Sequence, residues 1–219
     1  QPLPKLLIRF FMNLHQFCYA IIGAMAIEVE NGVHPKHRIM KYKEWFMGQI
    51  NSENVVLDIG CNTGMMSEVM SHKAKYVYGI EILCNLIEEA KILRQRDNIE
   101  FICADATKYD YSKCQPIDCI TLSNVLEHIE HRIDFLSKLI AQINWKNSNF
   151  KKIIIRVPMI DRDWLSMYKY DLGVEYRLDP THYTEYTFEQ FENELKQSNI
   201  QILSYHIKFG EIYAVCSAT

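Results

Sequence analysis

Along most of the chain, short apolar runs alternate with segments whose apolar residues recur at helical spacing. The strand-like runs cover residues 54–58, 75–81, 99–103, 117–123 and 152–157. The helix-like segments cover residues 65–72, 84–94 and 133–143. This alternation is typical of a parallel sheet covered by helices on both faces. The run at 152–157 is almost continuously apolar, as expected of a strand buried on both faces.

The pattern changes near the C-terminal end. Residues 187–197 are expected to form a helix with Thr187 at its N-cap, and strand-like runs follow at 200–208 and 211–217. So short a connection between the two runs predicts a hairpin, which makes the last strand antiparallel. We therefore expect an α/β fold: a Rossmann-like three-layer αβα sandwich with a seven-stranded, mostly parallel sheet, an antiparallel last strand and additional N-terminal helices.

Two segments lie outside this pattern. Residues 1–50 predict an N-terminal helical segment that serves as a lid, and residues 51–219 predict the main domain. Within that domain, residues 158–186 are rich in Asp, Tyr and Trp and are too long for an ordinary connection. We expect them to form an insert that binds substrate.

The N-terminal segment is apolar but interrupted. Within residues 6–27 the interruptions are Arg9, Asn13, His15 and Gln16. The longest uninterrupted part, residues 17–27, is far shorter than the ~20 residues that span a bilayer. We expect no transmembrane span and no signal peptide, but helices that pack on the domain or on a second subunit, as in a homodimer. The alternative is a helix on a membrane surface, near a lipid-linked substrate.

Charge and cysteine usage narrow the class of protein. A net charge of −3 argues against a dedicated nucleic-acid binder, which needs a basic face to neutralise phosphates. The seven cysteines are scattered and include no C-x-x-C pair. This pattern predicts reduced thiols in a cytoplasmic protein, with neither disulfides nor a zinc site.

Polar residues and glycines follow four of the expected strands. Gly60 and Gly64 occur in the turn VVLDIGCNTG, where glycine allows a tight turn and a close approach of the following helix to a ligand. Glu81 ends the second strand, at a position where an acid in a nucleotide-binding sheet accepts hydrogen bonds from ribose hydroxyls. Asp105 follows the third strand. The segment 124–128 follows the fourth strand. Ligands bind at the carboxyl ends of strands in open α/β sheets, so these features predict one binding crevice.

At these positions the chain resembles the class I (Rossmann-like) S-adenosylmethionine-dependent methyltransferases of the small-molecule type. LDIGCNTG resembles their motif D-x-G-x-G-x-G, with Asn62 at the middle glycine position. Asn tolerates left-handed backbone better than other residues with a side chain, so the loop is expected to form. The N-P-P-[YFW] signature of methyltransferases that act on nucleic-acid bases or on glutamine is absent after the fourth strand.

The resemblance implies S-adenosylmethionine as cofactor and S-adenosylhomocysteine as product. Asp58 and the loop would hold the aminoacyl end, Glu81 the ribose and Ile82 the adenine ring, with Asp105 and Ala106 at the adenine edge. The residues expected to bind the cofactor are Asp58, Gly60, Cys61, Asn62, Gly64, Glu81, Ile82, Asp105, Ala106, Asn124 and Val125. Arg38 is a further candidate, because a guanidinium pairs well with the cofactor carboxylate; the alternative is a basic surface turn.

The implied reaction moves a methyl group to an O, N or C atom of a small molecule by in-line displacement. His182 and His128 are the candidate general bases, because histidine titrates near neutral pH. His72, His131 and His206 show no metal-ligand spacing, so no metal is expected. The alternatives are a non-catalytic relative that binds the cofactor and a nicotinamide-dependent oxidoreductase, which would normally carry G-x-G-x-x-G.

Overall fold

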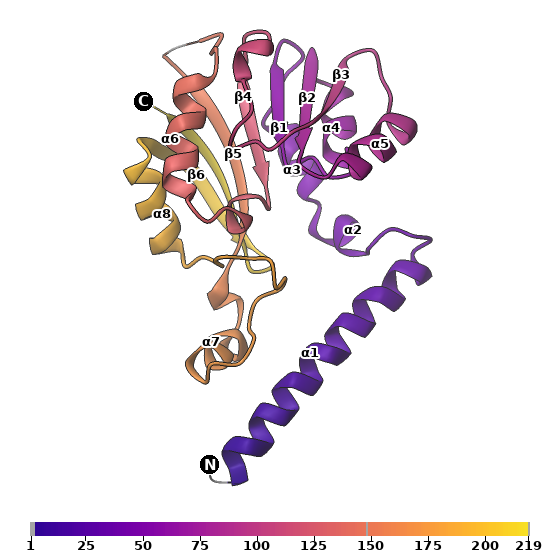
Figure 1. Ribbon diagram of the computed structural model, residues 1–219, viewed down its shortest axis with the longest axis vertical. Coiled ribbons are helices and arrows are strands. Elements are labelled where there is room, and N and C mark those ends of the chain that lie inside the picture. The colour runs from indigo at the N-terminus through magenta and orange to yellow at the C-terminus, as the bar shows by residue number, and fades with distance from the viewer. Residues whose placement is uncertain (1–2, 148, 219) are drawn as a thin grey trace.

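The computed structural model describes residues 3–147 and 149–218, and it contains one mixed sheet of seven strands (Figure 1). The strands are Val55–Ile59 (β1), Tyr76–Glu81 (β2), Ile99–Cys103 (β3), Cys119–Ser123 (β4), Lys151–Pro158 (β5), Ile200–Lys208 (β6) and Glu211–Ala218 (β7). Their order in the sheet is β3-β2-β1-β4-β5-β7-β6. β7 is antiparallel to both of its neighbours, while the pairs among β1 to β5 are parallel. The predicted sheet, with its reversed last strand, is confirmed.

The helices occupy the predicted places between the strands. They are Leu3–Val29 (α1), Lys36–Met40 (α2), Tyr42–Gly48 (α3), Met65–Ser71 (α4), Cys84–Leu93 (α5), Arg132–Gln142 (α6), Trp164–Asp171 (α7) and Phe188–Gln197 (α8). Three short 3₁₀ turns are Tyr111–Lys113 (η1), Leu126–His128 (η2) and Ile160–Arg162 (η3). The Thr187 side chain accepts a hydrogen bond from the backbone N–H of Gln190, so α8 begins at the predicted cap.

Each face of the sheet carries its own apolar core because side chains alternate along a strand. In β1, Leu57 belongs to the core that α6 and α8 cover, whereas Val56 belongs to the core beneath α3, α4 and α5. On α6, Leu136 and Leu139 face the sheet at a helical spacing of three. The two cores make the central strands rigid, and the ends of these strands carry the loops described below.

Residues 158–186 form a compact extension beyond β5. This segment contains η3 and α7, and a β-bridge between Met159 and Tyr186 brings its two ends together. Inside it, Arg162 forms an ion pair with the buried Glu185.

The N-terminal segment contacts the domain along one side, and most of its apolar surface is exposed. α1 is one continuous helix of 27 residues that projects away from the sheet (Figure 1), and Met12 is its buried residue. Arg9 donates a hydrogen bond to the carbonyl of Leu172, and the Lys169 ammonium contacts Gln16 at 2.9 Å, so α1 runs beside α7. The helix continues through its polar residues, which therefore do not divide the apolar stretch into shorter elements.

Among the described residues, α1 is the one helix long and apolar enough to cross a membrane. The mean hydropathy of its most apolar 18-residue window is 1.4, and 6% of that window is buried. A signal sequence near an N-terminus has the same properties, so length and composition do not distinguish these roles. The apolar surface of α1 is exposed in either case.

Candidate functional site

A cavity of about 940 Å³ opens at the carboxyl ends of β1, β2, β3 and β4. Its size falls within the range of roughly 300–1,000 Å³ that is usual for small-molecule sites. Eight of the predicted cofactor residues line it: Gly60, Asn62, Glu81, Ile82, Asp105, Ala106, Asn124 and Val125. Its other end is lined by His128 and by Asp179, Thr181 and Tyr183 of the extension.

The turn after β1 requires glycine for steric reasons. Gly60 has a φ of 70°, and a Cβ atom there would lie 2.6 Å from a methyl group of Val125. The backbone N–H groups of Gly60 and Cys61 both donate to the carbonyl of Ile80, at 2.8 and 3.0 Å. These bonds tie the turn to β2 and hold it at the rim of the cavity.

Asn62 takes up the left-handed conformation that was expected of it, with a φ of 51°. Its backbone N–H donates to Glu81 Oε2 at 3.0 Å, and Leu83 N–H donates to Glu81 Oε1 at 3.1 Å. Two backbone donors therefore hold the Glu81 carboxylate at the cavity wall, where it can also accept hydrogen bonds from ribose hydroxyls. The neighbouring Ile82 is 60% exposed and offers an apolar surface to an adenine ring.

Asp105 lies at the same wall as Glu81. Its Oδ1 accepts hydrogen bonds from the backbone N–H and the hydroxyl of Thr107, and Lys108 pairs with Oδ2 at 2.9 Å. The Thr107 hydrogen bond, and next to it Lys108, lowers the pKa of Asp105. The carboxylate is therefore ionised at neutral pH and able to accept from a ligand amino group.

Asp58 does not line the cavity, contrary to the sequence prediction. It is buried beneath the glycine turn and accepts hydrogen bonds from Ser67 Oγ at 2.6 Å and Thr121 Oγ1 at 2.7 Å. Burial raises its pKa to about 6. Asp58 thus joins α4 to β4 under the turn and supports the cofactor loop from below.

Three other predicted residues also lie outside the cavity lining. Cys61 is buried, and burial raises the pKa of its thiol, so it behaves as a small apolar side chain. Gly64 packs against Phe101, where a Cβ atom would lie 2.5 Å from the ring. Arg38 is exposed and forms an ion pair with Glu30 at 2.6 Å, so the basic-turn alternative describes it better.

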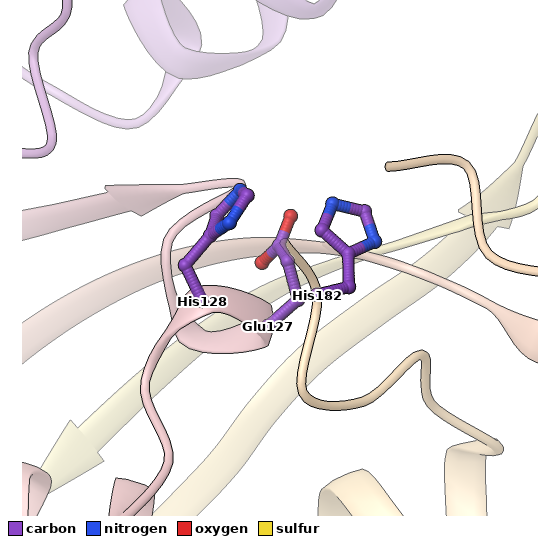
Figure 2. Close-up of side chains that lie close together, drawn as sticks. All are labelled: Glu127, His128 and His182. Carbon is purple, nitrogen blue, oxygen red and sulfur yellow. The ribbon is translucent and has the colours of Figure 1, made fainter. Parts of the chain in front are cut away.

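The predicted pair of histidines does come together. The His128 and His182 rings lie 4.7 Å apart between centroids, and the Glu127 carboxylate lies close to both, with one ligand atom of each residue within 4.8 Å of the others (Figure 2). Thr181 Oγ1 contacts His128 Nδ1 at 3.0 Å, and Glu185 Oε1 contacts His182 Nδ1 at 2.9 Å. Burial, together with the adjacent His182, lowers the pKa of His128, so this ring is neutral at pH 7.

Glu127 is the residue of this cluster whose role the sequence did not suggest. It is fully buried, with a relative exposure of 0%, and burial raises its pKa to about 8. Neither carboxylate oxygen has a hydrogen-bond partner in the described part of the chain. The sequence analysis placed both histidines at one site, and the signal for Glu127 was its position next to His128 after β4.

One disulfide contradicts the prediction of fully reduced thiols. Cys84, at the start of α5, bonds to Cys103, at the end of β3, with a Cα–Cα distance of 5.1 Å. The sequence separation of 19 concealed the contact, because the β2–α5 turn brings α5 back beside β3. Stable disulfides are typical of oxidising compartments, so the cysteines no longer support the predicted cytoplasmic location.

Fold and cavity together define a Rossmann-like nucleotide-binding domain, with an acid placed for ribose and an open second end for another reactant. Residues 34–205, more than half of the chain, match the model of the family described as "Methyltransferase domain". The chain belongs to this family. Its fold is that of the class I S-adenosylmethionine-dependent methyltransferases, and the residues that line the cavity fit that cofactor.

Solved structures agree with this fold. An S-adenosylmethionine-dependent methyltransferase from Clostridium acetobutylicum superposes with a TM-score of 0.64 at 13% identity, covering 92% of this chain and 99% of that one. The magnesium protoporphyrin IX methyltransferase of Synechocystis, solved with bound S-adenosylhomocysteine, gives a TM-score of 0.60 at 17% identity, covering 84% and 83%.

Curated relatives match over shorter stretches. The ubiquinone biosynthesis O-methyltransferase of Saccharophagus degradans is 30% identical over 80 residues, which are 36% of this chain and 34% of the relative. An uncharacterized RNA methyltransferase of Clostridium tetani is 40% identical over 60 residues, 26% of this chain and 13% of the relative. The match therefore spans about a third or less of the length of either relative.

Proposed function

We propose that this chain transfers the methyl group of S-adenosylmethionine to a small-molecule acceptor. The proposal rests on one observation: the predicted cofactor residues and the candidate base His128 line a single cavity. Glu81, Ile82 and Asp105 line the same cavity as His128 and Tyr183. A cofactor bound beside Glu81 would present its sulfonium toward His128, where an acceptor can enter.

The protein's part in the reaction is to position the reactants and to exclude water from them. The sulfonium supplies an activated methyl group, so the chain must hold the acceptor atom in line with the S–CH3 bond and exclude water. The backbone donors that fix Glu81 immobilise the cofactor side, and the extension that carries Thr181 and Tyr183 closes over the acceptor side.

Of the two predicted bases, His128 is the better placed to accept a proton from the acceptor. It lines the cavity, is neutral at pH 7, and is held through Nδ1 by Thr181. His182 is 6% exposed and lies behind His128, fixed by Glu185. Its expected role is therefore to position His128, unless both rings serve a bound ion.

A small acceptor fits the charge of the site better than RNA does. Carboxylates outnumber lysines among the charged residues that line the cavity, which disfavours phosphates, and the net charge of the chain is −3. These residues are Glu81, Asp105, Glu130, Asp134 and Asp179, with Lys108 and Lys138. The relative that methylates in ubiquinone biosynthesis is consistent with an apolar or lipid-linked acceptor. The relatives named as RNA methyltransferases are the reason to test RNA directly.

We further propose that α1 contacts a membrane surface. Its less exposed residues are Ile8, Arg9, Met12, Gln16, Gly23 and Ala26, which lie along one side at helical spacing. The remaining surface exposes large apolar side chains, among them Phe10, Phe17 and Ile22. A helix held to the protein along one side and apolar elsewhere is suited to the interface of a bilayer, close to lipid-linked acceptors.

Calorimetry with S-adenosylhomocysteine and with NAD tests the cofactor assignment. We expect binding of the first and none of the second; the reverse would overturn the assignment. Radiolabelled methyl transfer is then measured with a panel of phenols and quinols and with total RNA. Label in a small molecule supports the proposal, label in RNA contradicts it, and cofactor binding without any transfer identifies a non-catalytic relative.

A further inference from the structure

Three side chains that the proposed reaction does not fully use converge beside the cavity: His128 lines its wall, and Glu127 and His182 are buried next to His128. Glu127 and His128 come from η2, directly after β4, and His182 comes from the segment before α8 (Figure 2). Each offers one ligand atom, and these atoms all lie within 4.8 Å of one another. More than fifty residues of sequence separate the two sources, so only the fold assembles the group.

The carboxylate of Glu127 lacks a partner within the described residues. Both of its oxygens are inaccessible to solvent and without a hydrogen bond, and the residue is 0% exposed. Burying a carboxylate without compensation is unfavourable, so such groups are usually protonated, paired or bound to a cation. The buried Arg156 guanidinium also acts on Glu127; its Nε donates to Asn124 and pairs with Glu211, while its Nη1, like the Glu127 oxygens, has no hydrogen-bond partner among the described residues.

Both imidazoles are held in a way that frees their other nitrogen. Glu185 engages Nδ1 of His182 at 2.9 Å, and Thr181 Oγ1 engages Nδ1 of His128 at 3.0 Å. Glu185 is itself anchored by the Arg162 guanidinium. Histidines that bind metals usually have one ring nitrogen held by a carboxylate, hydroxyl or carbonyl group, which directs the other nitrogen at the ion.

We propose that Glu127, His128 and His182 bind one divalent first-row transition cation at the cavity wall that His128 lines. Two imidazole nitrogens and one carboxylate are a donor set suited to Zn²⁺, Fe²⁺ or Mn²⁺, and three protein ligands leave coordination positions open for a substrate. Ligands of a tetrahedral zinc ion lie ~3.4 Å apart, so small rotations of these side chains complete the site.

This inference rests on the proposed function and makes it more specific: the acceptor atom is a hydroxyl oxygen. A hydroxyl bound to the cation loses its proton to water, because the cation lowers the pKa of the O–H group. An oxygen lone pair then forms the new O–CH3 bond while the S–CH3 bond breaks, and its electron pair stays on sulfur. The products are a methyl ether and S-adenosylhomocysteine, and neither histidine needs to act as a base.

Metal binding can be measured without turnover. The full chain carrying Cys18→Ser, which removes the exposed free thiol, is stripped with a chelator and titrated with Zn²⁺ and Mn²⁺ by equilibrium dialysis. We expect one ion per chain, at least tenfold weaker binding in Glu127→Gln and His182→Ala, and no change in the control His72→Ala. Co²⁺ should give a ligand-field spectrum that the Glu127→Gln variant lacks.

The alternative is a protonated Glu127 in a dry pocket, and it makes the opposite prediction. Binding of no ion, or binding that Glu127→Gln and His182→Ala leave unchanged, would overturn the metal site. Thermal unfolding and S-adenosylhomocysteine binding of each variant show whether it is folded. If the cofactor binds and no cation does, the metal site alone fails; if the cofactor does not bind, the proposed function fails whatever the cation does.

Discussion

At the scale of single residues, the acids of the site differ in what surrounds them. Two backbone N–H groups hold Glu81 at the cavity wall. Asp58 is instead buried under the turn, where it accepts hydrogen bonds from two hydroxyl groups. Both follow expected strands in the sequence, and both were expected to face the cofactor. Their positions on opposite sides of the loop give them different roles, one in binding and one in support.

Glu81→Gln should weaken binding of S-adenosylhomocysteine by about 10- to 100-fold. The substitution removes a charge-assisted hydrogen bond to ribose, worth roughly 1.5–3 kcal/mol, and keeps the side-chain size. Calorimetry measures the loss, with Glu89→Gln on the exposed side of α5 as the control. Equal affinities in the two variants would mean that Glu81 does not contact the cofactor.

Asp58→Asn should make stability less dependent on pH. Burial raises the pKa of Asp58 from 3.8 to about 6, so the folded state holds its proton more tightly than the unfolded state does. Ionisation of Asp58 therefore lowers the free energy of unfolding. The loss is absent below the pKa that Asp58 has in the unfolded state, and it reaches about 3 kcal/mol above the pKa that it has in the folded state. Relative to the parent, the variant should gain stability as pH rises from 4 to 7.

Urea unfolding at pH 4, 5, 6 and 7 measures this gain. Other titrating groups are shared by the two proteins and cancel in the difference. Parallel stability profiles would show that Asp58 ionises normally in the folded protein.

At the scale of elements, the disulfide joins the start of α5 to the end of β3 beside the cavity. Cys84 lies after β2 and Cys103 is the last residue of β3, so the bond is close to Glu81 and Asp105 at the cavity wall. Closing a loop of this length restricts the unfolded chain and contributes about 3 kcal/mol to stability.

A double variant with Cys84→Ser and Cys103→Ser should therefore unfold at a lower urea concentration than the oxidised parent. The parent treated with a reducing agent should unfold at the same concentration as the variant. Cys18→Ser, which removes an exposed free thiol, serves as the control and should retain the parent midpoint. A parent that is insensitive to reductant would indicate that the bond does not form in solution.

At the scale of the whole molecule, α1 gives the protein a second surface besides its cavity. Held to α7 by Arg9 and Gln16, the helix exposes its apolar residues on the remaining sides. A monomeric soluble domain rarely leaves so much apolar surface uncovered. An exposed apolar helix is consistent with the proposed membrane contact and with the alternative of a homodimer.

The variant with Phe10→Asp and Phe17→Asp should lose more than tenfold in its partition onto phosphatidylcholine vesicles. Two exposed aromatic side chains are removed, each contributing roughly 2 kcal/mol when buried in lipid. The matched control Asn13→Asp with His15→Asp adds the same number of acids to α1 without removing apolar surface. Flotation measures the partition. A parent that forms dimers in light scattering and ignores vesicles would contradict the membrane contact and favour the dimer.

Most of the sheet and much of the adenosyl half of the site were predictable from the sequence. The bounds of β3 and β6 and the start of α5 agree with the expected segments, because strands and helices impose periods of two and 3.6 on their own side chains. Gly60, Asn62 and Glu81 were predictable for a related reason: the topology of the fold places the ends of its strands at one rim.

What the sequence by itself determined is therefore local: the period of each element, the caps, and the turns that only glycine or asparagine can make. Tertiary structure decided whether Asp58 faced the cavity or the core, whether Cys84 met Cys103, whether α1 was covered, and whether His182 joined Glu127 and His128. Each of these depends on contacts between residues far apart in the chain. Such contacts depend on how whole elements pack, and the residue pattern within any one element does not predict them.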